Sequence, residues 1–390
     1  MTKAKNWPSF TKEEGNAVKR ILLSNKVNYL FGDEGKKFEK KFSDFTNSKF
    51  SLALANGTLA LDLCLRTIGI KKGDEVIVTG RTFIASASCI SLLGAKPIFV
   101  DVDLNSQNID VSTIKNALTK KTKAIICVHF AGFPCDMPSI IRFAKENKLY
   151  VIEDCAQAHG AMISGKSVGS FGDINAWSFC NDKIITTGGE GGMITTNNSS
   201  LFKKAATFNN HGKNLTKFFA LSNKKISKFP YLHDDLGLNY RMTEMQSAIG
   251  NIQLSRIYRW NKIRNRNAQV ILDKVKNLNI VKIPKIDPKF THAFYKLYLV
   301  LQSEFIKSNF SRADIIDEMT KRGIPVSFGA SGRVFLEKGF KIYKTIPRDL
   351  PNSTFLEENS LMFQVHPSIT LKQIRLTASI IHNVLLKFQK

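Results

Sequence analysis

Between residues 50 and 200 the chain alternates short apolar runs, rich in β-branched residues, with stretches of helical periodicity. The apolar runs are bounded by turn residues and are predicted to be strands, over 51–55, 75–78, 97–100, 124–129, 149–153, 175–179 and 193–196. The stretches between them are predicted to be helices, over 58–69, 82–94, 110–119 and 137–147. Strands that alternate with helices favour a mostly parallel sheet covered on both faces, which is an α/β fold.

The second half of the chain has a different pattern. Residues 207–236 are polar and rich in Lys, Asn and Phe without a clear period, which is typical of a functional or mobile loop. A helix is predicted to resume near 243–270. A smaller α+β unit is predicted to follow, with a helix over 311–322 and strands over 294–301, 324–328 and 361–366.

The last helix has a recognisable start signal. Thr370-x-x-Gln373 resembles a capping box, in which two side chains satisfy the first backbone N–H groups of a helix. Together these patterns predict two domains. We expect a large domain over 1–255, whose N-terminal segment could pack on the small domain, and a small C-terminal domain over 256–390.

Composition and charge limit the function classes. The 390 residues include 57 Lys and Arg against 32 Asp and Glu, a net charge of +25. Such a charge would suit nucleic acid or an anionic membrane, but basic pairs such as Lys71-Lys72 are scattered and no nucleic-acid motif is present. We therefore favour a solvated Lys-rich surface, which would also attract a phosphorylated substrate, and we predict no nucleic-acid partner.

The cellular location is also constrained by the sequence. No apolar run reaches the ~18 residues of a membrane span, and residues 1–10 lack the apolar segment of a signal peptide. The six cysteines form no CxxC pair, and they are predicted to be reduced thiols in a cytoplasmic protein. No metal site is predicted.

Three predicted strand ends carry chemically useful residues, at the edge where open α/β sheets bind ligands. The first is Asn56-Gly57-Thr58, where a helix N-terminus could bind a phosphate. An ordinary capped connection between a strand and a helix is the alternative.

The second and third strand ends supply an acid and a lysine. Asp154 follows an apolar run and needs a cationic partner if it is buried, either a protonated ring nitrogen or a structural cation. His159, nearby, is expected to be packed or to cap a helix. Lys183 precedes a glycine-rich run, 188–192, and could bind a cofactor aldehyde covalently, although by itself it could equally be one more surface lysine.

Taken together, these features predict a pyridoxal phosphate site. A phosphate cradle, an acid that keeps the pyridine nitrogen protonated and a lysine that holds the aldehyde are the parts that this cofactor requires. Phe83, at the start of a predicted helix, could stack on the ring.

The order of the motifs resembles the sugar aminotransferases of the DegT/DnrJ/EryC1/StrS family, which are fold-type I pyridoxal-phosphate enzymes. The resemblance extends from about Phe31 to the C-terminus. The matching stretches are GDEVIV (73–78), TFIAS (82–86), GAKPIFVDVD (94–103), EDCAQAHGA (153–161), the SFxxxK run (178–183), GEGGMITTN (189–197) and LGLNYRMTEMQSAIGNIQL (236–254). This many ordered motifs is a far more specific signal than one isolated motif.

The resemblance implies a role for each matching residue. Lys183 corresponds to the lysine that carries the cofactor, and Asp154 to the partner of the pyridine nitrogen. The implied cofactor contacts are Gly57, Thr58 and Ser178 at the phosphate, Phe83 on the ring face, Gln157 near the ring hydroxyl, and Asn239 reaching the phosphate from the neighbouring subunit. The implied substrate contacts are His211, Lys213 and Arg241, and substrate selectivity is expected in 207–236 and in the segment from Phe328 to Arg333.

The resemblance also implies the activity. The expected enzyme moves an amino group from glutamate to a nucleotide-linked ketosugar, with a 4-keto-6-deoxy sugar as the first candidate, for amino-sugar and surface-polysaccharide biosynthesis. It is expected to be a homodimer with shared active sites.

Some features leave alternatives open. The family's PxxTF and SGT patterns are here Thr79-Gly80-Arg81-Thr82-Phe83 and Asn56-Gly57-Thr58, which blurs the local details. A dehydratase branch of the family replaces the lysine by histidine, so Lys183 argues against it. A 3-ketosugar enzyme and a DNA-binding regulator are further alternatives. A dinucleotide-binding dehydrogenase lacks support because no GxGxxG turn is present.

Overall fold

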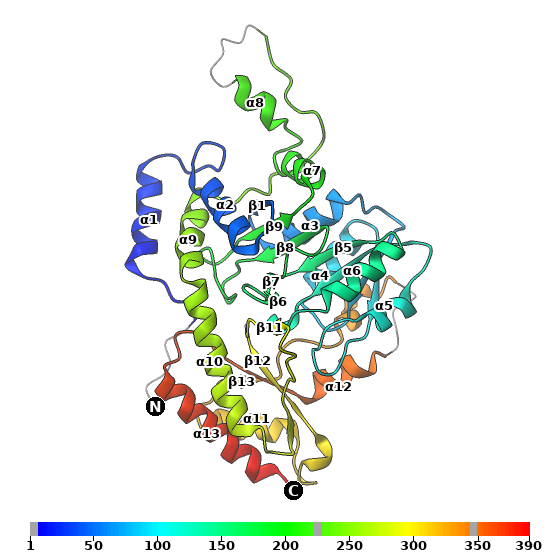
Figure 1. Cartoon of the computed structure of the whole chain (residues 1–390), viewed down its shortest axis with the longest axis vertical. Helices are drawn as coiled ribbons and strands as arrows, with labels where there is room; N and C mark the ends of the chain where they lie inside the picture. The colour runs from blue at the N-terminus through cyan, green and yellow to red at the C-terminus, as the bar shows by residue number, and fades with distance from the viewer. Residues whose placement is uncertain (1–6, 222–227, 344–348) are drawn as a thin grey trace.

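The computed structural model describes residues 7–221, 228–343 and 349–390. Its largest sheet has seven strands in the order β1-β9-β8-β5-β4-β2-β3 (Figure 1). These are β1 (Phe50–Leu54), β2 (Glu75–Thr79), β3 (Lys96–Val100), β4 (Thr122–Val128), β5 (Tyr150–Asp154), β8 (Ile174–Ser178) and β9 (Gly192–Thr196). The five strands from β8 to β3 are parallel, and at one edge β9 pairs antiparallel with both β8 and β1, so β9 alone runs against the other six strands. The predicted α/β class and mostly parallel sheet are confirmed.

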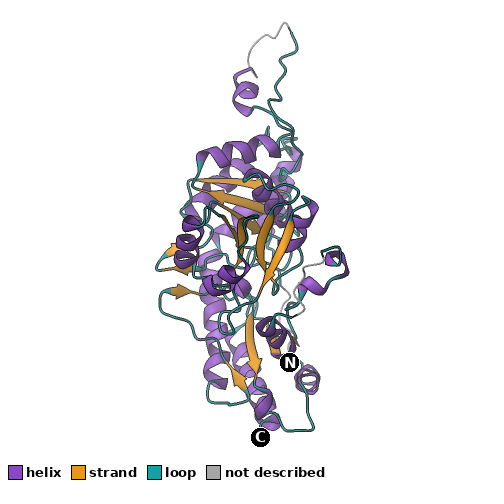
Figure 2. Cartoon of the chain, turned by 90° about the vertical axis from the view of Figure 1, so that its right-hand side faces the viewer, coloured by secondary structure: helices purple, strands orange, loops and turns teal. Residues whose placement is uncertain are grey.

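Helices cover both faces of this sheet, as Figure 2 shows. Val76 and Val78 share one apolar core with α3 and α4, whereas Ile77 belongs to the core on the opposite face. This alternation follows from the two-residue period of a strand. The covering helices include α3 (Gly57–Thr67), α4 (Ala85–Leu92), α5 (Val111–Ala117), α6 (Met137–Glu146) and α7 (Ser199–Asn209).

The first 46 residues contain two helices for which we made no prediction, α1 (Lys12–Leu23) and α2 (Glu34–Thr46). Phe38 and Phe42 of α2 are fully buried under the sheet. Both helices also pack on α9 (Glu244–Ser255), which continues into α10 (Ile257–Val275).

The prediction of a structureless stretch over 207–236 is partly wrong. It contains the end of α7 and a short helix, α8 (Leu215–Leu221), on an arm that projects from the top of the molecule in Figure 1. Asn210 faces Asn239 and Lys213 faces His233 in isolated antiparallel bridges at the base of the arm.

A second sheet lies at the C-terminal end of the molecule, in the order β10-β12-β14-β13. Its strands are β10 (Val281–Lys282), β12 (Leu297–Leu301), β13 (Val326–Ser327) and β14 (Ser360–Phe363), and its helices are α11 (Arg312–Lys321), α12 (Pro351–Asn359) and α13 (Leu371–Phe388). The predicted capping box is present, because Thr370 and Gln373 exchange hydrogen bonds at the start of α13. A small third sheet joins β11 (Phe290–Thr291), β6 (Met162–Ile163) and β7 (Lys166–Ser167).

The second sheet has its own apolar core, formed from residues between 268 and 388. Phe335 and Phe340, however, pack into a core of the large sheet. The predicted division at residue 255 stays a prediction. None of the described helices combines the length and apolar character that a membrane crossing requires.

Candidate active site

The first of the three strand ends, Asn56-Gly57-Thr58, is built from a tight contact between two elements. Asn56 caps α3, and its side chain accepts a hydrogen bond from Leu59 N at 2.9 Å. A Cβ on Gly57 would lie 2.6 Å from the Cβ of Ser178, so only glycine fits there without a shift. Thr58 is exposed beside it. The cap uses Leu59 N and leaves the N–H groups of Gly57 and Thr58 available to an anion next to the Ser178 hydroxyl.

Asp154 ends β5 and is 5% exposed. Its carboxylate accepts hydrogen bonds from the hydroxyl of Ser86 in α4 at 2.8 Å and from Ala156 N at 3.1 Å. Burial raises the pKa of Asp154, although these two hydrogen bonds and the charge of Lys183 oppose the increase. None of the ion pairs among the described residues involves this carboxylate. A buried acid of this kind fits a cationic ring nitrogen.

Lys183 lies in the loop after β8, and its side chain approaches Tyr295, just before β12 of the second sheet. Its amine is 3.9 Å from the Asp182 carboxylate and 5.0 Å from the centre of the Tyr295 ring. The indole N–H of Trp7 donates to Lys183 O at 2.8 Å and fixes the backbone at this position. Asp182 also accepts a hydrogen bond from the Tyr295 hydroxyl.

Two further predicted residues take positions that suit a flat ring. The amide oxygen of Gln157 accepts a hydrogen bond from Ala131 N at 2.7 Å, which orients this side chain. Phe83 follows a buried run and is 66% exposed just before α4, so its ring is open to a stacking partner. With the phosphate cradle and Asp154, these residues fit pyridoxal phosphate.

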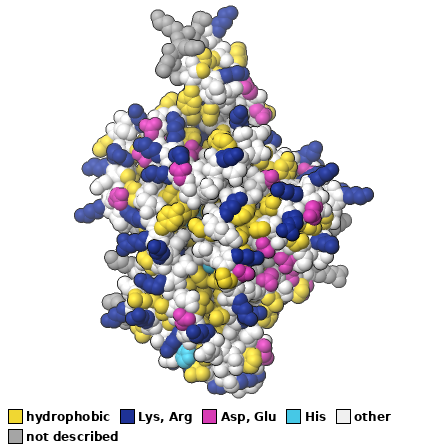
Figure 3. Space-filling view, in the orientation of Figure 1, with side chains coloured by type: hydrophobic (Ala, Val, Ile, Leu, Met, Phe, Trp, Pro, Cys, Tyr) yellow, Lys and Arg dark blue, Asp and Glu magenta, His cyan; other side chains and the backbone are white. Residues whose placement is uncertain are grey.

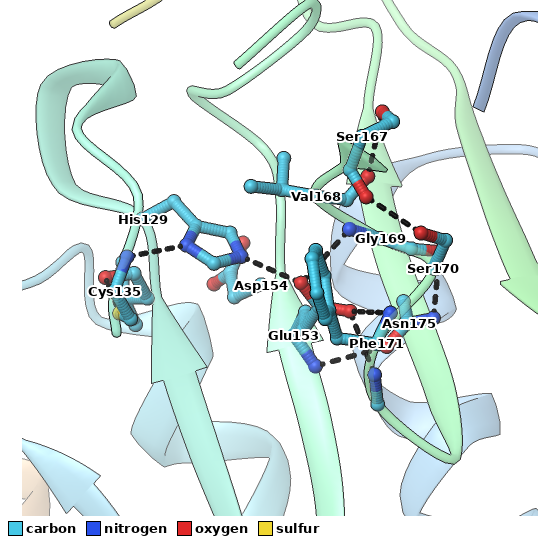
Figure 4. Close-up of polar contacts among 12 residues, drawn as sticks. His129, Cys135, Glu153, Asp154, Ser167, Val168, Gly169, Ser170, Phe171 and Asn175 are labelled. Atoms are coloured by element: carbon cyan, nitrogen blue, oxygen red, sulfur yellow. Dashed lines mark hydrogen bonds and ion pairs between the residues drawn. The ribbon is translucent and has the colours of Figure 1, made fainter. Parts of the chain in front are cut away.

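Beside Asp154, the side chain of Glu153 makes a separate buried network (Figure 4). His129 Nδ1 accepts from Cys135 N at 3.0 Å, so its Nε2 carries the proton and donates to Glu153 at 3.0 Å. Glu153 also accepts from the backbone N–H groups of Gly169, Phe171 and Gly172 at 2.8–2.9 Å.

The same network includes side chains whose ligand atoms are close enough together to suggest a metal site. His129, Glu153 and Cys155 offer ligand atoms within 4.8 Å of one another. The His and Glu atoms are already used in hydrogen bonds, so the group acts as a structural support for the loop after β7 rather than as a metal site.

His159 is packed, as predicted. It is fully buried, and its ring lies 5.1 Å from that of Trp177 and 5.6 Å from that of Phe179. Burial lowers the pKa of His159 to about 3. A ring that stays neutral among aromatic side chains is unsuited to proton transfer near neutral pH.

The remaining predicted residues lie elsewhere. His211, Lys213 and Asn239 belong to the base of the projecting arm, and Arg241 donates to the Asn210 side chain at 3.2 Å. Phe328 is 62% exposed on the loop after β13. Among the described residues, none of the recorded hydrogen bonds or ion pairs joins these five to Lys183 or Asp154.

Sequence reasoning missed several residues that line the same site, namely Trp7, Ser86, Tyr295 and Lys296. Ser86 lies inside the quoted TFIAS stretch, so its nearness to Asp154 could have been considered. Tyr295 and Lys296 reach the site from the second sheet, and their spacing from Lys183 carries no signal.

Solved structures identify the class of fold. The chain superposes on an aminotransferase from Psychrobacter cryohalolentis with a TM-score of 0.95 and 46% identity, covering 99% of this chain and 100% of that one. It also superposes on S. venezuelae DesV in complex with a ketimine intermediate, with a TM-score of 0.85 and 27% identity over 96% of this chain and 94% of that one. The fold is that of the fold-type I pyridoxal-phosphate aminotransferases.

The sequence comparisons identify the family. Residues 8–382 match the DegT/DnrJ/EryC1/StrS aminotransferase family, and the chain belongs to it. It is 39% identical to GDP-perosamine synthase of Escherichia coli O157:H7 over 301 residues, which are 76% of this chain and 77% of that protein. It is 33% identical to UDP-N-acetyl-3-dehydro-alpha-D-glucosamine 3-aminotransferase of Acidithiobacillus ferrooxidans, covering 92% and 90% of the two chains. The protein is an aminotransferase, and the predicted family is confirmed.

Proposed function

We propose that this enzyme moves an amino group from glutamate to a nucleotide-linked ketosugar. The relatives named above act on GDP- and UDP-linked sugars, which supports a nucleotide sugar as the acceptor. A 4-keto-6-deoxy sugar is the first candidate and a 3-keto sugar the second, and the product would enter surface-polysaccharide synthesis. The single observation that carries the chemistry is the buried Asp154 carboxylate, which has no ion-pair partner in the described part of the chain and is influenced by the charge of Lys183.

Each residue of the site would have a defined task. The N-terminus of α3 with Ser178 would hold the phosphate of pyridoxal phosphate, and Asp154 would keep the ring nitrogen protonated. When bound, the cofactor supplies a ring that accepts electrons from the substrate carbon. Lys183 would hold the cofactor through Nζ and, once displaced by the amino donor, would take the proton from the donor's α-carbon.

We further propose that the enzyme is a homodimer with shared sites, in which Asn239 reaches the partner's phosphate group. The exposure of apolar side chains on the arm supports this, because Phe229 is 75%, Tyr231 82% and Leu236 87% exposed. Figure 3 shows hydrophobic side chains on the arm, whereas Lys and Arg are scattered over the whole visible face. The scattered charge supports no nucleic-acid surface.

The function is tested with purified protein, glutamate and a panel of nucleotide ketosugars, with the products identified by mass spectrometry. Protein loaded with the cofactor should be yellow, and glutamate should bleach the band. Borohydride reduction and peptide mapping should find the cofactor on Lys183. Lys183→Ala should abolish turnover, whereas Lys321→Ala, an exposed lysine on α11, should leave it unchanged. Normal turnover by Lys183→Ala would refute the assigned role.

A further inference from the structure

Lys296 is a buried lysine beside Lys183 that the proposed chemistry does not use. Its side chain is 9% exposed, and its amine lies 3.7 Å from the Asp182 carboxylate and 4.7 Å from the centre of the Tyr295 ring. Lys183 faces the same carboxylate at 3.9 Å and the same ring at 5.0 Å. One carboxylate and one aromatic ring are therefore shared by two amines.

The Lys296 amine has hydrogen-bonding capacity to spare. It donates to the neutral side-chain oxygen of Gln364 at 2.9 Å. An ammonium group has three N–H donors, and the distance to Asp182 exceeds the ~2.7–2.9 Å of a charge-assisted hydrogen bond. Asp182 is itself engaged by the Tyr295 hydroxyl and is half exposed. Lys296 is thus held in place without being neutralised.

A second buried cation lies behind this pair. Arg264 is 1% exposed, and its Nη1 donates to Tyr295 O at 3.1 Å. Its Nε and Nη2 have no hydrogen-bond partner in the described part of the chain. Because Arg264 is fully covered, it would act on a ligand through its charge rather than by contact. The charge of Arg264 also acts on Lys296 and on Asp182. Burial, with a smaller contribution from the charge of Arg264, lowers the pKa of Lys296 to about 8.

The cluster therefore has an excess of positive charge. Lys296 and Arg264 are two buried cations. Asp182 is the carboxylate whose charge raises the pKa of both, and it also faces Lys183. Burying cations is costly unless an anion compensates them. This composition fits a site that is completed by the anionic group of a ligand.

We propose that Lys296 is a specificity-determining residue that binds a carboxylate of the amino donor, with Arg264 strengthening the field behind it. The inference rests on the proposed function. The donor is favoured over the acceptor because its α-carbon must come within reach of Lys183. Its carboxylate is bonded directly to that carbon, whereas the diphosphate of a nucleotide sugar is separated from the reacting carbon by the sugar ring.

The two half-reactions separate the donor from the acceptor. In the first, the rate at which glutamate bleaches the cofactor band is measured by stopped flow. Lys296→Met should raise the glutamate concentration for half-maximal rate about 10- to 100-fold, since it removes a hydrogen bond from a charged group. Lys296→Arg should recover most of this loss, and the exposed control Lys321→Met should match the wild type.

In the second half-reaction, protein already converted by excess glutamate and freed of it is mixed with the ketosugar that the product panel identifies. Lys296→Met should match the wild type here within about twofold, given that the lost contact is to the donor. An unchanged glutamate requirement, or an equal loss in both half-reactions, would overturn the proposal.

A binding measurement makes the test independent of turnover. Glutarate is a dicarboxylate that lacks the amino group, and calorimetry should detect its binding to the wild type and to Lys321→Met but not to Lys296→Met. Equal binding by all three proteins would overturn the assignment of Lys296. If glutamate fails to bleach the wild type at all, the proposed function fails instead, so the two failures are distinguishable.

Discussion

Replacing Glu153 by glutamine tests whether the buried network of Figure 4 holds the site together. Glu153 is 0% exposed, and its two oxygens accept four hydrogen bonds at 2.8–3.0 Å. Glu153→Gln keeps the shape of the side chain but replaces one oxygen by an NH2 group. One oxygen serves Phe171 N and Gly172 N, and the other serves Gly169 N and His129 Nε2. In either orientation, the new NH2 group therefore faces two donors.

The magnitude follows from these contacts. Two buried donors lose their acceptor, at about 1–3 kcal/mol each, and the remaining hydrogen bonds lose the assistance of the charge. We expect a loss of about 3–5 kcal/mol in the free energy of unfolding. Unfolding entropy is about 2.1 cal/mol/K per residue, or about 0.8 kcal/mol/K for this chain, so the Tm should fall by about 4–6 °C.

Differential scanning calorimetry of the cofactor-loaded protein measures this change. The matched control is Glu337→Gln, because Glu337 is exposed and an exposed substitution of this kind changes stability by less than about 0.5 kcal/mol. A Tm for Glu153→Gln within about 1 °C of this control would refute the reasoning. It would mean that the loop after β7 is held by other contacts.

Two further predictions concern a glycine and a pH dependence. Gly57→Ala should lower cofactor affinity at least about tenfold in a fluorescence titration, because the new Cβ would lie 2.6 Å from the Ser178 Cβ. The control Gly15→Ala places its Cβ in open space on α1 and should leave cofactor affinity unchanged. Equal affinity for the two variants would contradict the predicted clash. Burial raises the pKa of Glu39 from its usual 4.5 to about 7, despite hydrogen bonds from Ala53 N and the Tyr29 hydroxyl. The stability from this raised pKa is present below about pH 4.5 and is lost as pH rises through about 7. Relative to Glu39→Gln, the wild type should therefore lose up to about 3 kcal/mol between pH 4.5 and 7.5 in urea unfolding, and a constant difference would contradict this.

Local patterns predicted the strands that carry the site. Val76, Ile77 and Val78 alternate between the two apolar cores, and the period of the sequence is enough to predict a buried strand there. The same period implies that Glu153 and Asp154 point to opposite faces of the sheet. The sequence does not say which of the two acids is saturated by backbone N–H groups, because those donors come from the later loop over 169–172.

Tertiary packing decided what local patterns could not. The chain has 57 Lys and Arg residues, and nothing in the sequence distinguishes Lys296 and Arg264 as the ones that are buried beside Lys183. Their burial depends on β12 and α10, which pack in the core of the second sheet. The short helix α8 was missed for a related reason: seven residues are too few for a helical period to stand out.

Arg81 shows how a departure from a family motif can be compensated at long range. It occupies the Thr79-Gly80-Arg81 segment, just before Phe83, and is fully buried. Its guanidinium donates to Gln107 at 2.8 Å, in the segment between β3 and α5, and to the Ser360 hydroxyl at 3.0 Å at the start of β14. It also lies over the Phe130 ring at 4.7 Å. A change next to the predicted stacking residue is thus stabilised by partners up to 279 residues away in the sequence, and only the folded arrangement of the two sheets reveals them.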